Sequence, residues 1–224
     1  MSPDAGRVLA AARALGLVPN DQQVSSLLKF LAELGRWNAT YNLTALRDPQ
    51  AMFTHHLVDC MAAVPPVLRW VGRRSGLKVL DVGSGGGLPG IVWAILIPEL
   101  DITCVDAVGK KAAFVRQVAG ELGLRVTARH ARVETLGAPR FDLITSRAFS
   151  SLQDLTLLTR SSLATGGAWV ALKGKAPDTE IAALGAETRV FHVEPLTVPD
   201  LDAERCLVWM EARPDSAETG HPPG

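Results

Sequence analysis

The sequence has few of the residues that mark disulfide-rich, metal-binding or membrane proteins. Its three cysteines, Cys60, Cys104 and Cys206, are widely spaced and form no C-x-x-C pair, which argues against a disulfide framework and a zinc site. The apolar runs are far shorter than the roughly 20 residues of a membrane-spanning helix, and no signal peptide precedes the first expected helix. We therefore expect a soluble, cytoplasmic protein with no metal and no membrane contact.

An excess of charge of one sign is also missing. The formal net charge at pH 7 is zero, so overall electrostatics favour neither nucleic acid nor a membrane surface as a partner. Residues 1–76 hold 8 Lys and Arg against 5 Asp and Glu, a net charge of +3 that the rest of the chain balances with −3. With 47% hydrophobic residues, a chain of 224 residues is long enough for one α/β domain and an appendage.

Glycine, in contrast, is concentrated in one stretch. Residues 78–90 read KVLDVGSGGGLPG, in which a strand-like segment runs into a glycine-rich turn, and the following IVWAILI predicts a buried helix. Glycine accepts positive φ and lets a ligand approach the backbone closely, and the start of a helix offers unpaired N–H groups to an anion. The stretch therefore predicts the nucleotide-binding turn of an α/β domain.

This turn fits two templates. Gly85, Gly87 and Gly90 match the dinucleotide pattern G-x-G-x-x-G, whereas the run that starts at Asp81 matches D-x-G-x-G-x-G, which is typical of S-adenosylmethionine enzymes. Both templates need an acidic residue about 20 positions further on to hold ribose hydroxyls, and Asp106 supplies it. Asp81 favours S-adenosylmethionine, because a carboxylate there can meet the ammonium of a methionine moiety but would repel a pyrophosphate.

The order of expected elements predicts the fold class. Helical spacing before the turn predicts three helices, the second of which is expected to end by Asn38 because residues 37–44 are polar and β-branched. After the turn, strands alternate with helices, and the last two strands follow each other directly. This pattern predicts a Rossmann-like methyltransferase fold, with a seven-stranded, mostly parallel sheet and one reversed strand. We divide the chain into an N-terminal helical extension, the Rossmann-like domain and a disordered tail: residues 1–76, 77–213 and 214–224.

Residues just past each strand are the candidates for chemistry, because ligands bind at the carboxyl ends of the strands in such sheets. After the third strand, Val133 and Glu134 could meet the adenine, and Leu88 in the turn could supply an apolar wall. Arg147 follows the fourth strand and Lys173 the fifth.

The end of the fourth strand indicates the kind of acceptor. Ser146-Arg147 stands where enzymes that methylate exocyclic amines carry an Asn/Asp-Pro-Pro-Tyr-like motif, and the cysteine nucleophile of pyrimidine-carbon methylation is missing. Guanine N7 fits this site because it already holds an exposed lone pair, so that direct displacement requires mainly alignment. Arg147 could donate to guanine O6 or to a phosphate, or form a strand-end salt bridge.

Further candidates for RNA contact are Asn38, Asn42, His55, His56, Lys110 and Lys111. The two adjacent histidines point about 100° apart on a helix, which makes them a poor metal pair, and they either contact substrate or lie at the edge of the core. Trp37 and Tyr41 could stack on unpaired bases or pack the helices onto the sheet. The two lysines begin a helix, where they could meet a phosphate or simply face solvent.

Taken together, these residues resemble one family closely, the bacterial small-subunit ribosomal RNA guanine-N7 methyltransferases, also called glucose-inhibited division protein B. The resemblance covers residues 30–175 in order. It implies that Gly83, Leu88, Val133, Glu134 and Arg147 fall where the family binds S-adenosylmethionine. Two departures are mild: Val133 stands where many relatives have alanine, and Ala107 where many have Ser or Glu. The matching stretches are Trp37-Asn38, residues 41–45, residues 47–49, His55-His56-Leu57 with Asp59, residues 81–91, Asp106 with Lys110-Lys111 and Phe114, residues 146–149 and Lys173-Gly174.

The sequence therefore predicts an enzyme that methylates guanine N7 at one site in 16S ribosomal RNA with S-adenosylmethionine and without a covalent intermediate. Two rivals stay open: an NAD(P)-binding oxidoreductase and a non-catalytic RNA- or nucleotide-binding module. The residues expected at the reaction are Arg147 and Lys173. Those expected to bind the cofactor are Asp81, Gly83, Gly85, Gly87, Leu88, Asp106, Val133, Glu134 and Arg147.

Overall fold

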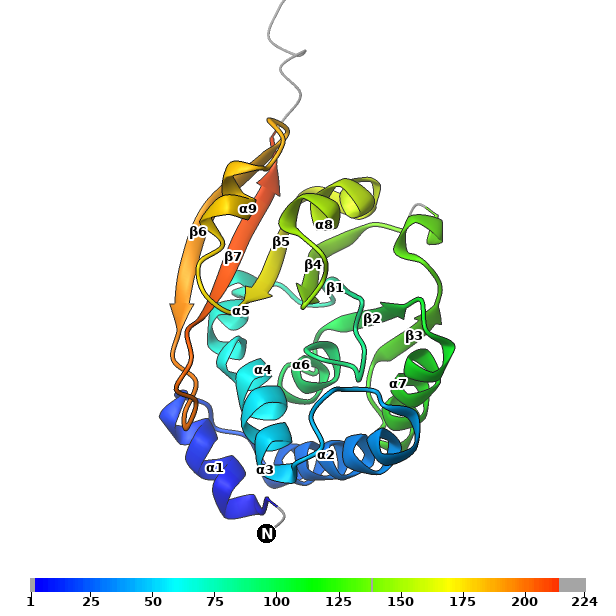
Figure 1. Cartoon of the computed structure of the whole chain (residues 1–224), viewed down its shortest axis with the longest axis vertical. Helices are drawn as coiled ribbons and strands as arrows, with labels where there is room; N and C mark the ends of the chain where they lie inside the picture. Colours follow the sequence, from blue (N-terminus) through cyan, green and yellow to red (C-terminus); the bar gives the residue numbers. More distant parts are fainter. Residues whose placement is uncertain (1–2, 138, 214–224) are drawn as a thin grey trace, which may run out of the picture.

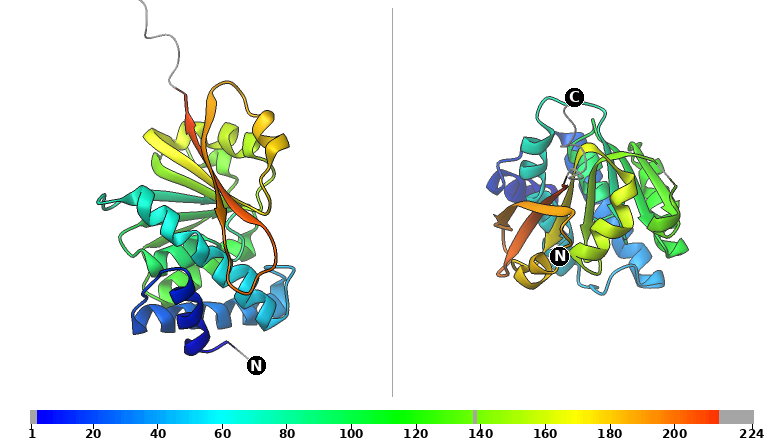
Figure 2. Two further views of the ribbon diagram at one scale, coloured as in Figure 1. Left: turned by 90° about the vertical axis from the view of Figure 1, so that its left-hand side faces the viewer. Right: turned by 90° about the horizontal axis from the view of Figure 1, so that it is seen from above.

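A seven-stranded sheet with helices on both faces forms the centre of the part of the chain that the computed structural model describes, residues 3–137 and 139–213 (Figure 1; Figure 2). The strand order is β3-β2-β1-β4-β5-β7-β6. Neighbouring strands are parallel except where β7 pairs antiparallel with β5 and β6. The predicted mostly parallel sheet with one reversed strand is confirmed. The strands are β1 Lys78–Val82, β2 Asp101–Asp106, β3 Val126–His130, β4 Phe141–Arg147, β5 Leu163–Lys173, β6 Thr188–Leu196 and β7 Arg205–Ala212.

Helices cover the two faces of the sheet unequally. The side chains of β1 alternate between the faces: Val79 belongs to the larger hydrophobic cluster, and Leu80 to the smaller one. The larger cluster lies under α6, α7 and the N-terminal helices, and the smaller one under α8 and α9 (Figure 1). The helices are α1 Ala5–Ala14, α2 Asp21–Tyr41, α3 Pro49–Met52, α4 Asp59–Ala62, α5 Val64–Val71, α6 Gly90–Leu96, α7 Gly109–Glu121, α8 Leu152–Thr159 and α9 Asp178–Ala182, with a π-helical segment at Phe53–Val58.

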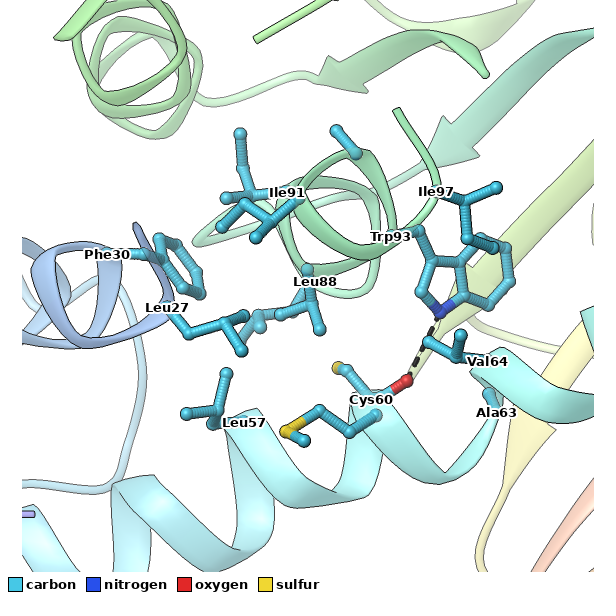
Figure 3. Packing of buried hydrophobic residues seen from close by; sticks show 14 of the residues in the cluster. Leu27, Phe30, Leu57, Cys60, Ala63, Val64, Leu88, Ile91, Trp93 and Ile97 are labelled. Carbon is cyan, nitrogen blue, oxygen red and sulfur yellow. Dashed lines mark hydrogen bonds between the residues drawn. The ribbon is translucent and has the colours of Figure 1, made fainter. Parts of the chain in front are cut away.

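The N-terminal helices share their hydrophobic cluster with the sheet. Leu27 of α2 and Leu57 of the π-helical segment point toward one another and belong to the same cluster as Ile91 of α6 (Figure 3). The indole of Trp93 donates a hydrogen bond of 3.2 Å to the Cys60 carbonyl (Figure 3). The α1–α5 segment ends before β1, which agrees with an extension up to residue 76, but that boundary stays a prediction. The tail predicted at 214–224 lies outside the described residues.

The expected end of the second helix was wrong. Helix α2 continues to Tyr41 and ends at Asn42, which has the left-handed conformation (φ 51°) that often ends a helix. Tertiary packing extends it, because the Trp37 ring lies 5.6 Å from the Phe114 ring of α7 and 5.1 Å from the Tyr41 ring, centroid to centroid. Such contacts outweigh the small helix propensities of single residues.

None of the helices within residues 3–137 and 139–213 is long and apolar enough to cross a membrane.

Candidate functional site

Two cavities lie at the carboxyl ends of the strands, one on either side of the segment that follows β4. The first, of about 270 Å³, is lined by residues from the ends of β1, β2 and β3 and by Phe149; the second, of about 480 Å³, is lined by Arg147 and Ala148 together with residues from β5 and the N-terminal helices. Ala148 between them has a φ of 59°. This conformation is rare for a residue with a Cβ, so surrounding contacts must hold the segment in place.

The glycine turn borders the first cavity through Gly83. Gly83, Gly85 and Gly87 have φ values of 66°, 56° and 76°, which only glycine adopts without strain. A Cβ on Gly87 would lie 2.5 Å from Cγ1 of Ile91, and one on Gly83 would lie 3.1 Å from the Phe149 ring. The turn therefore needs glycine for conformation at all three positions and for space at two of them.

Asp106 joins the glycine turn to the end of β2. Its Oδ2 accepts a hydrogen bond of 2.9 Å from the Gly85 N–H, and its Oδ1 accepts one of 2.8 Å from the Val108 N–H. Val133 and Glu134 line the same cavity from the segment after β3. A hydrogen bond from its own backbone N–H and the ion pair with Arg132 hold the pKa of Glu134 below its usual value. The cavity thus combines fixed carboxylates with an apolar wall.

Asp81 lies beneath the turn and not on the cavity wall. Its side chain is fully buried, and its Oδ2 accepts a hydrogen bond of 2.9 Å from the Gly90 N–H at the start of α6. Its Oδ1 has no hydrogen-bond partner among the described residues. Burial raises the pKa of Asp81 from 3.8 to about 7. Leu88 is also buried, in the core below the turn (Figure 3), and does not line the cavity.

A network of charged groups forms the second cavity. Arg147 donates hydrogen bonds of 2.9 Å to the His55 carbonyl and 3.3 Å to Oδ2 of Asp59. Arg205, the first residue of β7, donates one of 2.7 Å to Oδ1 of the same aspartate. One buried carboxylate therefore holds two guanidinium groups. The pairing of β5 with β7, in which Lys173 faces Cys206, places Arg205 beside the end of β5.

His56 takes part in this network as a neutral imidazole. Burial, followed by the charge of Arg147, lowers the pKa of His56 from 6.5 to about 4. A guanidinium can only donate hydrogen bonds, so Nδ1 accepts from Nη2 of Arg147 at 3.2 Å, although the His55 carbonyl lies at 3.1 Å. The ring proton is thereby assigned to Nε2, which donates to Oγ1 of Thr44 at 2.6 Å.

Lys173 also lines the second cavity, but its charge is paired. Its Nζ lies 2.9 and 2.8 Å from the two carboxylate oxygens of Glu180 on α9. The exposed fraction of its side chain is 16%. The structure thus brings Arg147, Lys173, His55 and His56 together at one cavity, and their contact with substrate stays a prediction.

The remaining candidates for RNA contact lie elsewhere. Asn38 is buried, and its amide bridges the Leu46 carbonyl (2.6 Å) and the Thr44 N–H (2.8 Å), so it shapes the loop that carries Thr44. Asn42 ends α2 and accepts from Arg47 at 2.9 Å. The Lys110 ammonium lies 5.3 Å from the Tyr41 ring centre, and Lys111 follows on α7. These positions line neither cavity.

Sequence reasoning did not assign roles to Asp59, Arg205, Glu180 and Phe149. Asp59 belongs to the segment H-H-L-x-D, and its spacing from His56 was the available signal. Arg205 is 146 positions away from the aspartate that it contacts, so no local pattern could reveal the pair.

Among residues 3–137 and 139–213, no group of three or more His, Cys, Asp or Glu is arranged to hold a metal ion.

Comparison with known proteins identifies the family. The family model GidB, described as rRNA small subunit methyltransferase G, matches residues 23–208. A ribosomal RNA small subunit methyltransferase G from Acidovorax ebreus is 57% identical over 207 residues, covering 89% of this chain and 91% of that protein. The protein of the same name from Leptothrix cholodnii is 55% identical over 214 residues, covering 95% and 98%.

Solved structures agree on the fold. A SAM-dependent methyltransferase from Leishmania major superposes with a TM-score of 0.58 at 14% identity, covering 81% of this chain and 83% of that one. TrmN from Thermus thermophilus gives a TM-score of 0.53 at 21% identity, covering 67% and 48%. At these identities the likeness concerns the fold alone.

These matches support neither an oxidoreductase nor a non-catalytic binding module. The predictions of a methyltransferase that acts on small-subunit ribosomal RNA, and of S-adenosylmethionine as its cofactor, are confirmed by the family match and the shared fold. With this identity over about nine-tenths of its length, the chain belongs to the rRNA small subunit methyltransferase G family.

Proposed function

We propose that the protein transfers a methyl group from S-adenosylmethionine to N7 of a single guanine in 16S ribosomal RNA by direct displacement. The observation that carries the proposal is the pair of cavities lined by residues 147–149, one by Phe149 and the other by Arg147 and Ala148. One has the groups that suit an adenosine, and the other has cations that suit a guanine and its phosphate. The segment after β4 contributes to both walls, so the two ligands would meet there.

The first cavity fits the cofactor residue by residue. Asp106 is fixed by two backbone N–H groups and keeps lone pairs for ribose hydroxyls. Val133 and Phe149 offer apolar surface to the adenine, with Glu134 at its edge. Asp81 does not line this cavity; it would act from below the turn, where it holds the Gly90 N–H and, when ionised, would attract the ammonium of the methionine part. Bound S-adenosylmethionine would supply an electrophilic methyl group on its sulfonium.

The glycine turn and Leu88 would act through the backbone. Gly83 lets the turn approach the cofactor without a Cβ in the way, and the positive φ of Gly85 and Gly87 gives the turn its shape. Leu88 supports the turn from the core instead of touching the ligand.

The second cavity would orient the guanine. Two of its cations are Arg147, the last residue of β4, and Lys173, the last residue of β5. Asp59 holds Arg147 in place and is itself held by Arg205. Guanidinium groups donate to guanine O6 and to phosphate. His55 and His56 form the wall that lies toward the N-terminal helices. Contacts of Asn42, Lys110 and Lys111 with RNA would lie outside this cavity.

The reaction needs no general base. Guanine N7 attacks with a lone pair that carries no proton, and alignment is the main requirement for displacement. The Nδ1 lone pair of His56 already accepts from Arg147, and Asp59 is held by two guanidinium groups. The site therefore positions its substrate and leaves protonation states unchanged.

The RNA is expected to be presented in a small ribosomal subunit or an assembly intermediate, in the cytoplasm. A formal net charge of zero gives little non-specific attraction to naked RNA. Shape and protein contacts would then supply part of the docking.

Transfer of labelled methyl from S-adenosylmethionine to small subunits from cells that lack the protein tests the proposal. We expect one N7-methylguanine, lost in Arg147→Gln and kept in the control Arg13→Gln, an exposed arginine of α1. Binding of S-adenosylhomocysteine by each variant shows that the first cavity is intact. Label in another base, or none in RNA despite this binding, would contradict the proposed acceptor.

A further inference from the structure

Glu180 connects two elements at the second cavity, which we call the acceptor cavity because it would hold the guanine. The glutamate itself lines neither cavity. Its carboxylate oxygens lie 2.9 and 2.8 Å from Nζ of Lys173, the last residue of β5. Oε2 also accepts a hydrogen bond of 2.8 Å from the backbone N–H of Leu152, the first residue of α8. One carboxylate therefore ties the end of β5 to the start of the helix that follows Ala148.

This contact fixes a side chain that would otherwise be mobile. A lysine has a flexible four-carbon stem and no preferred direction for its ammonium. Contact with both carboxylate oxygens holds Nζ at one place on the cavity wall, where the side chain is mostly buried. Because the same carboxylate holds Leu152, the segment between the two cavities is fixed relative to the ammonium.

Glu180 also sets the charge that an RNA strand meets at the cavity. Arg147, Arg205 and Lys173 contribute three positive charges, and Asp59 and Glu180 contribute two negative ones, while His56 is neutral. The cluster thus carries a net charge of about +1, by the ordinary charges of these side chains at neutral pH. Loss of the Glu180 charge would raise this to about +2 and attract phosphate more strongly.

We propose that Glu180 is a positioning residue for methyl transfer, which holds the Lys173 ammonium in place and limits the positive charge of the acceptor cavity. This inference rests on the proposed function. The inference predicts that kcat and KM respond differently to loss of Glu180, because alignment of the ammonium governs kcat and the net charge of the cavity governs binding of RNA. A residue with a purely structural role would not produce this difference.

Glu180→Gln tests both effects. The amide oxygen can still accept from the Leu152 N–H, whereas the charge that holds Lys173 is gone. We expect kcat for methylation of small subunits to fall about tenfold, since displacement of an orienting group by ~1 Å can cost more than that. We expect KM for the subunits to fall, because the cavity becomes more positive. Glu180→Asp keeps the charge on a side chain that is one methylene shorter, so it should restore KM and recover kcat only in part.

Glu99→Gln is the matched control, because it removes one negative charge from an exposed loop after α6. It should leave kcat and KM unchanged. The free energy of unfolding and the affinity for S-adenosylhomocysteine are measured for every variant, so that a folding defect is recognised.

A double-mutant comparison decides whether Glu180 acts through the lysine. In a Lys173→Met background, Glu180→Gln should change kcat less than twofold. An equal loss of kcat in both backgrounds, or a rise of KM in parallel with the fall of kcat, would overturn the inference. Failure of the proposed function looks different, because the unaltered protein would then place no methyl group on guanine N7.

Discussion

The buried carboxyl group of Asp81 should make the stability of the protein depend on pH in a direction that can be measured. Burial raises the pKa of Asp81 from 3.8 to about 7 in the folded protein. The folded state therefore binds this proton more tightly than the unfolded chain does. The free energy of unfolding should fall as the pH rises from 3.8 to about 7, and stay low above that. Asp81→Asn removes this titration but keeps an oxygen that can accept from the Gly90 N–H.

The size of the effect follows from the displacement of the pKa. A difference of one in pKa corresponds to about 1.4 kcal/mol, so the contribution of Asp81 changes by about 4 kcal/mol between pH 4 and pH 8. His56 acts in the opposite direction over part of this range, because its folded pKa of about 4 lies below 6.5. The two contributions partly cancel in the unaltered protein. The difference between variant and unaltered protein isolates Asp81.

Denaturation by urea at pH 4.5, 6, 7 and 8 provides the measurement, with equal m-values as evidence that the unfolded states match. We expect the stability of Asp81→Asn relative to the unaltered protein to rise by a few kcal/mol between the lowest and highest pH. Asp202→Asn, at an exposed aspartate, is the control and should show no such rise. A difference that stays constant with pH to within about 1 kcal/mol would refute the reasoning.

The same variant should separate stability from ligand binding. If Asp81 attracts the ammonium of the cofactor, the variant binds S-adenosylhomocysteine more weakly at pH 8 although its relative stability is greatest there. Calorimetric titration at that pH measures the affinity. Unchanged binding would remove Asp81 from the cofactor site and leave the stability prediction standing.

Three further predictions concern the stability of variants at Asp59, His56 and Gly87. Asp59→Asn leaves two mostly buried guanidinium groups without their charged partner and should lower the free energy of unfolding by about 3 kcal/mol, as urea denaturation would show. His56→Gln removes a contribution that by itself falls by about 3 kcal/mol from pH 6.5 down to pH 4, because the unfolded chain binds that proton more tightly, so urea denaturation should show the stability of the variant relative to the unaltered protein rising by that amount as the pH falls. Gly87→Ala should lower the thermal midpoint, since its Cβ would lie 2.5 Å from Ile91, whereas Gly120→Ala, which meets nothing within 4 Å, should leave it unchanged or raise it.

Local patterns in the sequence were sufficient to predict the fold and the glycine turn. The glycine run, the acidic residue at the end of the next strand and the alternation of strands with helices are all short-range features. They predicted the mostly parallel sheet, its reversed strand and the position of Asp106 beside the turn. Parallel strands place their carboxyl ends at one edge, so Arg147 and Lys173 could be expected to lie near each other.

Tertiary packing decided what each of these side chains can do. The end of α2 depended on contacts of Trp37 with α7, which propensity does not register. Asn38 was a candidate for RNA contact by its type, but the loop folds over it and uses both ends of its amide. Whether a polar side chain reaches solvent or fills its hydrogen bonds inside the protein depends on what folds over it.

The sequence by itself thus determined the sheet and the residues that line up at its carboxyl edge, because these follow from periodicity and from spacing along the chain, while the family followed from the resemblance of its motifs and the match to known relatives. Only the tertiary structure decided which charges neutralise one another. The single carboxylate of Asp59 that holds Arg147 and Arg205, and the pairing of Lys173 with Glu180, join separate elements of the fold. Electrostatic interactions depend on distance and burial in space, which separation along the chain does not specify.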